Sequence, residues 1–145
     1  MIREAVISDI NQIQIVRNSV KENILSDPTK VTDEDCRLFI EERGKGWVFE
    51  IENKIVGFSI VDLQDNNVWA LFIHPDFEQQ GIGRKLHNIM LDWYFEQTDE
   101  NIWLGTTPKT RAEIFYRKTG WKEIGTHGDN EIKFEMTKSF WIKKI

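Results

Sequence analysis

The spacing of apolar residues changes several times along the chain, and each change predicts a switch between helix and strand. Residues 2–7 are typical of a short strand. Ile10, Ile13 and Val16 then recur at helical spacing, and Ser8 stands where a side-chain oxygen can cap the first turn. The N-terminal segment therefore predicts a strand followed by an amphipathic helix.

A second helix is predicted to start at Thr32. Three acidic residues follow this threonine, and negative charge is favoured in the first turn of a helix. Cys36, Phe39 and Ile40 form its apolar stripe, and Gly44 stands at its end. We therefore expect the single cysteine of the chain to be buried rather than to act as a nucleophile.

The middle of the chain changes to strand patterns. Two apolar runs flank the turn residues 52–54 and predict a hairpin, and residues 65–67 form the next turn. Residues 68–73, with the sequence VWALFI, are continuously apolar. Such a run is typical of a central strand that is buried on both faces of a sheet.

Helices and strands alternate in the second half. A helix carries its apolar stripe at Leu86, Ile89, Met90 and Trp93, and residues 102–107 form a strand. The next helix starts either at Thr107-Pro108, with proline at the first helical position, or at Thr110 in a capping box. Two short strands near residues 121–125 and 132–136 follow, and the tail 138–144 is expected on the sheet edge or on a second subunit.

This order of elements predicts the fold class. The chain alternates as β-α-α-β-β-β-α-β-α-β-β, and hairpins followed by strand–helix–strand crossovers build an α/β fold with a mixed sheet. A length of 145 residues suits one domain, which we place at residues 1–145.

Composition excludes several classes of partner. The net charge is −5, so general binding to nucleic acid is not expected. No apolar run approaches the roughly 20 residues of a membrane span, so a membrane is not expected either. The N-terminus lacks the apolar region of a signal peptide, and one cysteine forbids an internal disulfide. We expect a cytoplasmic protein.

One loop does not fit this ordinary composition. In HPDFEQQGIGRKL, residues 74–86, two glycines precede Arg84 and Lys85, at a helix start that disfavours positive charge. Free N–H groups there attract anions, and glycines let a ligand come close to the backbone. A diphosphate would offset the cost of about 0.3–1 kcal/mol for each cation. Neither the Walker spacing nor the dinucleotide fingerprint is present, because Leu86 occupies the third glycine position.

The loop instead resembles motif A of the GNAT superfamily of N-acetyltransferases, whose pattern is Gln/Arg-x-x-Gly-x-Gly/Ala. Residues 68–75 look like the central strand of that family, and RAEIFYRKTGW, residues 111–121, looks like its motif B. The element order matches over essentially the whole chain. The family's Gln/Arg falls on Glu78 here, and Lys109 stands where many relatives carry asparagine.

This resemblance implies acetyl-coenzyme A as co-substrate, with no metal. Its pyrophosphate is expected on the loop residues Gln79, Gln80, Gly81, Ile82, Gly83, Arg84 and Lys85. A backbone N–H near Phe72 or Ile73 is expected to polarise the thioester carbonyl. The family also has a bulge in this strand, which separates two parallel strands and opens a cleft for the thioester.

Tyr116 is the candidate acid for the leaving thiolate. A phenol with a pKa near 10 can donate to a thiolate when the two are aligned, and motif B places its tyrosine at this position. Phe115 is expected in the core.

The acceptor side carries fewer signals. Many family members place a glutamate early in the central strand as the general base, but residues 66–69 hold no carboxylate here. Asp62 acting through a water chain could take that role instead, or the acceptor could be a weakly basic amine that needs no base. Trp69 is expected on one strand face with Leu71 and Ile73, where it either walls the acceptor pocket or belongs to the core. Asn23 either reaches over the acceptor site or is a solvated loop residue.

Together these features predict an N-acetyltransferase that moves an acetyl group from acetyl-coenzyme A to a primary amine by direct attack, with an unknown acceptor. The alternative is a non-catalytic acyl-coenzyme A binding or sensing module, which the absence of a strand glutamate favours. Dimers are common in the family, so a homodimer is left open.

Overall fold

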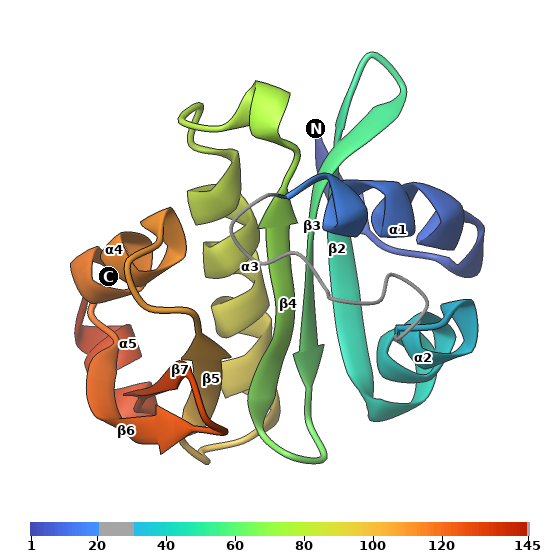
Figure 1. The fold of residues 1–145 in the computed structure, drawn as a ribbon. Helices are drawn as coiled ribbons and strands as arrows, with labels where there is room; N and C mark the ends of the chain where they lie inside the picture. Colours follow the sequence, from blue (N-terminus) through green and yellow to red (C-terminus); the bar gives the residue numbers. More distant parts are fainter. Residues whose placement is uncertain (21–30, 145) are drawn as a thin grey trace.

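A seven-stranded sheet runs through the molecule (Figure 1), with the strand order β1-β2-β3-β4-β5-β7-β6. The computed structural model describes residues 1–20 and 31–144. The strands are β1 Ile2–Glu4, β2 Gly44–Ile51, β3 Lys54–Asp62, β4 Asn67–Ile73, β5 Ile102–Thr106, β6 Lys122–His127 and β7 Glu131–Met136. Neighbouring strands are antiparallel except β4 and β5, which are parallel. The predicted α/β fold with a mixed sheet is confirmed.

Helices cover both faces of the sheet. They are α1 Ile10–Ser19, α2 Asp33–Leu38, α3 Ile82–Gln97, α4 Arg111–Lys118 and α5 Lys138–Lys144. Short helical turns occupy Ile7–Asp9, Phe39–Arg43 and Pro75–Phe77. α1 and α2 pack on one face through a core that includes Ile13, Cys36 and Phe58. α3, α4 and α5 pack on the other face, around Leu86, Met90 and Leu104. The burial of Cys36 confirms its predicted place in the core.

Two predicted helix starts are formed by side-chain caps. The Thr32 hydroxyl accepts a hydrogen bond from the N–H of Asp35 at 3.0 Å, and the Asp35 carboxylate accepts one from the N–H of Thr32 at 2.9 Å. Thr110 caps α4 by accepting from the N–H of Glu113 at 3.2 Å. Of the two starts considered for α4, the structure has the one at Thr110.

The predicted cap at Ser8 is wrong. Ser8 lies inside the turn Ile7–Asp9, and Asp9 is the residue that precedes α1. The Asp9 carboxylate accepts from the N–H of Val6 at 2.8 Å and pairs with Arg3 at 2.8 Å. The Asp9 carboxylate is therefore used in contacts with Val6 and with Arg3 on β1, and it makes no side-chain cap to α1.

The C-terminal tail also differs from the expectation. It forms α5, and the Trp141 side chain is buried rather than placed on the sheet edge. Its indole Nε1 donates to Asp92 Oδ1 on α3 at 2.8 Å, and its ring lies 5.5 Å from that of His87. The tail thus covers α3. Within the described ranges, no helix has the length and apolar character needed to span a membrane.

Candidate active site

The two parallel strands separate soon after they meet. Asn67 of β4 is in register with Trp103 of β5, and the N–H of Trp103 donates to the carbonyl of Asn66 at 3.0 Å. Among the described residues, no further β4–β5 register pair follows. The remaining edge of β4 is therefore free to line a cleft.

A bulge in β4 accompanies this separation. On the β3 side, Ile60 pairs with Ala70 and the next residue, Val61, pairs with Val68, so Trp69 is the extra residue. The bulge that the family resemblance implied thus lies at Trp69.

The bulge corrects two expectations about β4. Trp69 does not share a face with Leu71 and Ile73: it packs on the α1 side, whereas they pack on the α3 side. The extra residue shifts the alternation of side chains, which the sequence alone does not reveal. Nor is the strand fully buried on both faces, because only Val68 and Ala70 among its residues are buried. Trp69, Leu71, Phe72 and Ile73 are half-buried and line the clefts described below, and Asn67 lines neither cleft.

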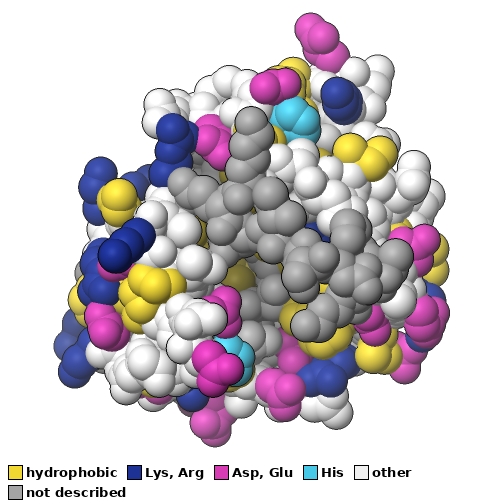
Figure 2. All heavy atoms as spheres, in the orientation of Figure 1, with side chains coloured by type: hydrophobic (Ala, Val, Ile, Leu, Met, Phe, Trp, Pro, Cys, Tyr) yellow, Lys and Arg dark blue, Asp and Glu magenta, His cyan; other side chains and the backbone are white. Residues whose placement is uncertain are grey.

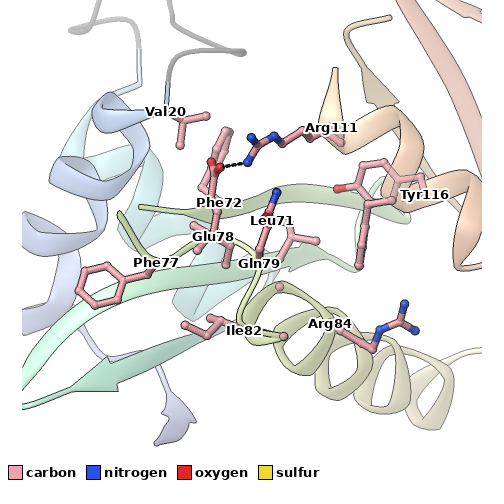
Figure 3. Close-up of a pocket in the computed structure, with 15 residues that line it drawn as sticks. Val20, Leu71, Phe72, Phe77, Glu78, Gln79, Ile82, Arg84, Arg111 and Tyr116 are labelled. Atoms are coloured by element: carbon pink, nitrogen blue, oxygen red, sulfur yellow. Dashed lines mark hydrogen bonds and ion pairs between the residues drawn. The ribbon is translucent and has the colours of Figure 1, made fainter. Parts of the chain in front are cut away.

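The first cleft has a volume of about 340 Å³ and lies between the end of β4, the glycine loop and α4 (Figure 3). Its lining includes Phe72, Ile73, Gln79, Gly81, Ile82, Gly83 and Arg84 from the predicted cofactor site. Gln80 and Lys85 are absent from this lining. The structure therefore brings most, but not all, of the predicted cofactor residues together.

The loop conformation explains one of the two glycines. Gly81 has φ +80°, the left-handed region that residues with a Cβ rarely adopt, and it precedes the first residue of α3. Gly83 is different: a Cβ there would meet Ile73 Cγ1 at an ordinary 3.6 Å. Its lack of a side chain matters for access, because it leaves the first turn of α3 open to the cleft.

The two loop cations point in different directions. Arg84 lines the first cleft, and Figure 3 shows its guanidinium between α3 and α4. The Lys85 ammonium instead lies 5.7 Å from the centre of the Phe49 ring on β2. A further cation, Arg111, pairs with Glu78 across the cleft mouth, so that α4 is tied to the glycine loop.

A second cleft of about 570 Å³ opens on the other side of Tyr116. Its lining includes Arg17 from α1, Trp69 from the bulge, Thr106 at the end of β5 and Glu131 at the start of β7. The two clefts share Leu71, Phe72, Ala112 and Tyr116. A ligand in the first cleft would therefore meet a ligand in the second at Tyr116.

Tyr116 is positioned by α4 and is 7% exposed. Its ring packs near Phe115 at 5.5 Å and Trp121 at 5.8 Å, and Figure 3 shows its hydroxyl directed toward β4. No hydrogen bond joins this hydroxyl to another residue in the described part of the chain. Burial raises the pKa of the phenol above its ordinary value, because the charged phenolate would be desolvated. The group is therefore a neutral donor throughout the physiological pH range.

The direction of the backbone N–H groups follows from one hydrogen bond. The N–H of His74 donates to the carbonyl of Val56 on β3 at 2.8 Å. Because successive residues of a strand direct their N–H groups to opposite edges, Phe72 also faces β3 and Ile73 faces the cleft. Of the two N–H groups considered for the thioester carbonyl, that of Ile73 has the suitable direction.

The remaining polar candidates that the structure describes, Asp62, His74 and Lys109, line neither cleft. Asp62 is buried and pairs with Arg43 at 2.7 Å, and it lines neither cleft. His74 Nδ1 accepts from the N–H of Asp76 at 3.1 Å, as a helix cap. Lys109 is exposed to solvent. Asn23 lies outside the described residues. Within residues 1–20 and 31–144, no group of His, Cys, Asp and Glu side chains could hold a metal ion.

Charge is unevenly distributed around the clefts. Figure 2 shows Lys and Arg side chains gathered along the left side of the face drawn, over α4 and the start of α3. Arg84 and Arg111 both line the first cleft. A local basic region thus flanks the glycine loop of a chain with a net charge of −5.

These features define a class of protein. A cleft between two separating parallel strands, with a helix N-terminus at one end and a tyrosine at the other, suits an enzyme that transfers an acyl group from a phosphate-bearing thioester. The sequence model of the acetyltransferase (GNAT) domain matches residues 42–123. The chain therefore belongs to the GNAT family, and it is an acetyl-coenzyme A-dependent acetyltransferase.

Solved structures agree with this fold. A PaiA N-acetyltransferase from Thermoplasma acidophilum, in complex with coenzyme A, superposes with a TM-score of 0.83 at 17% identity, over 94% of this chain and 98% of that one. A GNAT acetyltransferase from Staphylococcus aureus Mu50 gives 0.80 at 21%, over 94% and 98%. A ribosomal-protein-alanine N-acetyltransferase from Brucella melitensis gives 0.76 at 20%, over 94% and 99%.

Sequence reasoning missed three charged residues of the clefts. Arg17 continues the stripe of Ile10 and Ile13 at the seventh position, where a charged residue is unexpected. Arg111 is the first residue of α4, and positive charge is disfavoured at the start of a helix, as it is at Arg84 and Lys85. Glu131 carries no local signal, because only the pairing of β5 with β7 brings it to the cleft.

Proposed function

We propose that the protein acetylates a primary amine by direct attack of the amine on acetyl-coenzyme A, without an acyl-enzyme. The observation that carries the proposal is the meeting of the two clefts at Tyr116. One cleft suits the acyl donor and the other suits the amine, so the reacting atoms meet beside a neutral hydroxyl.

The donor would lie along β4 with its pyrophosphate at the start of α3. The N–H groups of Ile82, Gly83 and Arg84 have no partner in the preceding turn of a helix that begins at Ile82, and they suit phosphate oxygens. The Arg84 guanidinium adds a charge that lines the same cleft. Gln79, Gln80 and Gly81 would shape the glycine loop. Lys85 lies outside the lining of the first cleft and would add to the positive electrostatic potential there.

The chemistry balances with groups from this chain. The amine nitrogen forms a bond to the thioester carbon while the carbon–sulfur bond breaks, and the sulfur keeps the electron pair. The N–H of Ile73 would stabilise the negative charge on the carbonyl oxygen. Tyr116 would donate its proton toward the sulfur, and the new amide nitrogen must lose one.

A base for that proton is the remaining requirement. A lysine-like amine with a pKa near 10.4 costs about 4.6 kcal/mol to deprotonate at pH 7. Asp62 is committed to Arg43, and Glu78 to Arg111. Glu131 lines the acceptor cleft with a side chain that is 40% exposed, so it can pass a proton to water. We assign the base role to Glu131.

Calorimetric titration with acetyl-coenzyme A tests the donor site. We expect micromolar binding that weakens about tenfold in Arg84→Ala, since one charge-assisted contact is lost. Lys85→Ala is the matched variant: it removes the same charge one residue away and should have the smaller effect. Equal affinities for the wild type and Arg84→Ala would remove Arg84 from the site.

Release of coenzyme A in the presence of an amine panel separates the enzyme from the binding module. Binding without turnover of any amine would support the sensing alternative. Absence of binding at millimolar acetyl-coenzyme A would refute both.

A further inference from the structure

Arg17 is a buried cation on α1. It lies in the last turn of that helix and is 7% exposed. Its Nε and Nη2 atoms are buried and have no hydrogen-bond partner among the described residues. Within the described ranges, the guanidinium forms no ion pair, whereas Arg3, Arg37, Arg43, Arg111 and Arg117 each pair with a carboxylate.

Aromatic rings surround this guanidinium but do not neutralise it. Its central carbon lies 4.9 Å from the ring centre of Trp69, 5.0 Å from that of Phe72 and 5.8 Å from that of Phe58. Such contacts contribute roughly 0.5–2 kcal/mol each, whereas taking a charge out of water costs several kcal/mol. The rings hold the guanidinium in place, and an uncompensated cost remains.

The nearby thiol does not supply the missing charge. Among the described residues, Cys36 is the titratable group whose charge acts on Arg17. Burial raises the pKa of the Cys36 thiol, so the thiol stays neutral at physiological pH. Burial also lowers the pKa of Arg17 itself, because the charged guanidinium is desolvated.

The second cleft reaches the Arg17 side chain. The side chain lines that cleft together with Trp69, Tyr116 and Glu131. Its lining therefore contains a cation and a carboxylate. A planar guanidinium offers parallel N–H donors that match the two oxygens of a carboxylate.

We propose that the acceptor is an amine that also carries a carboxylate, and that Arg17 binds this carboxylate while the amine lies between Tyr116 and Glu131. This inference rests on the proposed function, since it assigns the acceptor cleft its ligand. It assigns a local anion-binding group to a chain whose net charge is −5. A dianionic phosphate fits less well, because Glu131 lines the same cleft.

The discriminating experiment compares matched amines in the coenzyme A release assay. α-Amino acids with apolar side chains are compared with their carboxamides, and with diamines that lack a carboxylate. The wild type should prefer the amino acid about 10- to 100-fold in kcat/KM. Arg17→Met should reduce that preference to about unity while acetyl-coenzyme A affinity stays the same. Arg37→Met, which removes an exposed charge outside both clefts, should retain the preference.

Folding of the variant is itself informative. Because Arg17→Met removes a buried charge that forms no ion pair with the described residues, its melting temperature should equal or exceed that of the wild type. If it nevertheless fails to fold, Arg17→Lys keeps the charge without the planar fork, and should lose most of the preference.

The outcomes separate this inference from the proposed function. Turnover with equal or better use of carboxamides or diamines would overturn the role of Arg17 and leave the acetyltransferase intact. If no amine is acetylated, the melting temperature is measured with coenzyme A and the amino acids. A rise that Arg17→Met lacks would support the carboxylate site, and no rise would refute it.

Discussion

Replacing Tyr116 with phenylalanine separates catalysis from folding. Tyr116 is 7% exposed and lines both clefts, and within the described residues nothing accepts or donates a hydrogen bond to its hydroxyl. Its removal therefore leaves no orphaned partner, and the free energy of unfolding should stay within about 1 kcal/mol of the wild-type value or increase. Loss of a general acid should lower kcat about 10²- to 10⁴-fold, or about 2.7–5.4 kcal/mol in the barrier.

Tyr94, the other tyrosine of the chain, is the matched control. Its hydroxyl donates to Asn66 Oδ1 at 3.0 Å, and it lines neither cleft. Tyr94→Phe should therefore lower stability by about 1 kcal/mol and leave kcat near the wild-type value. Urea unfolding and coenzyme A release measure the two quantities. A Tyr116→Phe enzyme within twofold of the wild-type kcat would show that another group protonates the thiolate.

The raised pKa of Tyr116 also sets a pH dependence. A phenol whose pKa is higher in the folded than in the unfolded state favours folding below the unfolded value of about 10, and that contribution is lost as the pH rises above it. The wild type should therefore lose stability above about pH 10 more steeply than Tyr116→Phe. Parallel unfolding curves for the two proteins at alkaline pH would contradict the burial of the phenol.

Two further changes test the neighbouring assignments. Glu131→Gln should lower kcat about 100-fold at pH 7 with unchanged acetyl-coenzyme A affinity, as measured by coenzyme A release and calorimetry; an unchanged kcat would leave the proton to water or to the amine itself. Arg43→Met should cost about 3–5 kcal/mol in urea unfolding, because Asp62, with 1% of its side chain exposed, would lose its partner. A loss below about 1 kcal/mol would show that water can solvate Asp62 in the variant, and would revive it as a candidate base.

The candidate site lies where the regular sheet is interrupted. The bulge at Trp69 and the separation of β4 from β5 free one strand edge, which a regular sheet would use for pairing. The same bulge moves Trp69 to the α1 side, where its ring lies 4.9 Å from the Arg17 guanidinium carbon. One irregularity thus accompanies both an open N–H group at Ile73 and an aromatic wall of the second cleft.

The sequence by itself determined the elements that depend on neighbouring residues. Apolar spacing placed α1 and α3, a hydroxyl cap placed α2, and Thr110 was one of two predicted starts of α4. The glycine loop with its cations predicted an anion site at the start of α3. These features follow from contacts within a few residues, which propensity and charge rules describe well. The motif around Tyr116, together with the glycine loop, predicted the GNAT family. The match of the GNAT domain model to residues 42–123 confirms this prediction.

Only the tertiary structure decided which side chains share a cleft. The bulge changed the face of Trp69, Asp9 rather than Ser8 precedes α1, and Asp62 pairs with Arg43, 19 residues away. Arg17 and Glu131 come from opposite ends of the chain and meet only through the order of strands. Such long-range pairings leave no local pattern, because they depend on register, burial and the desolvation of charge.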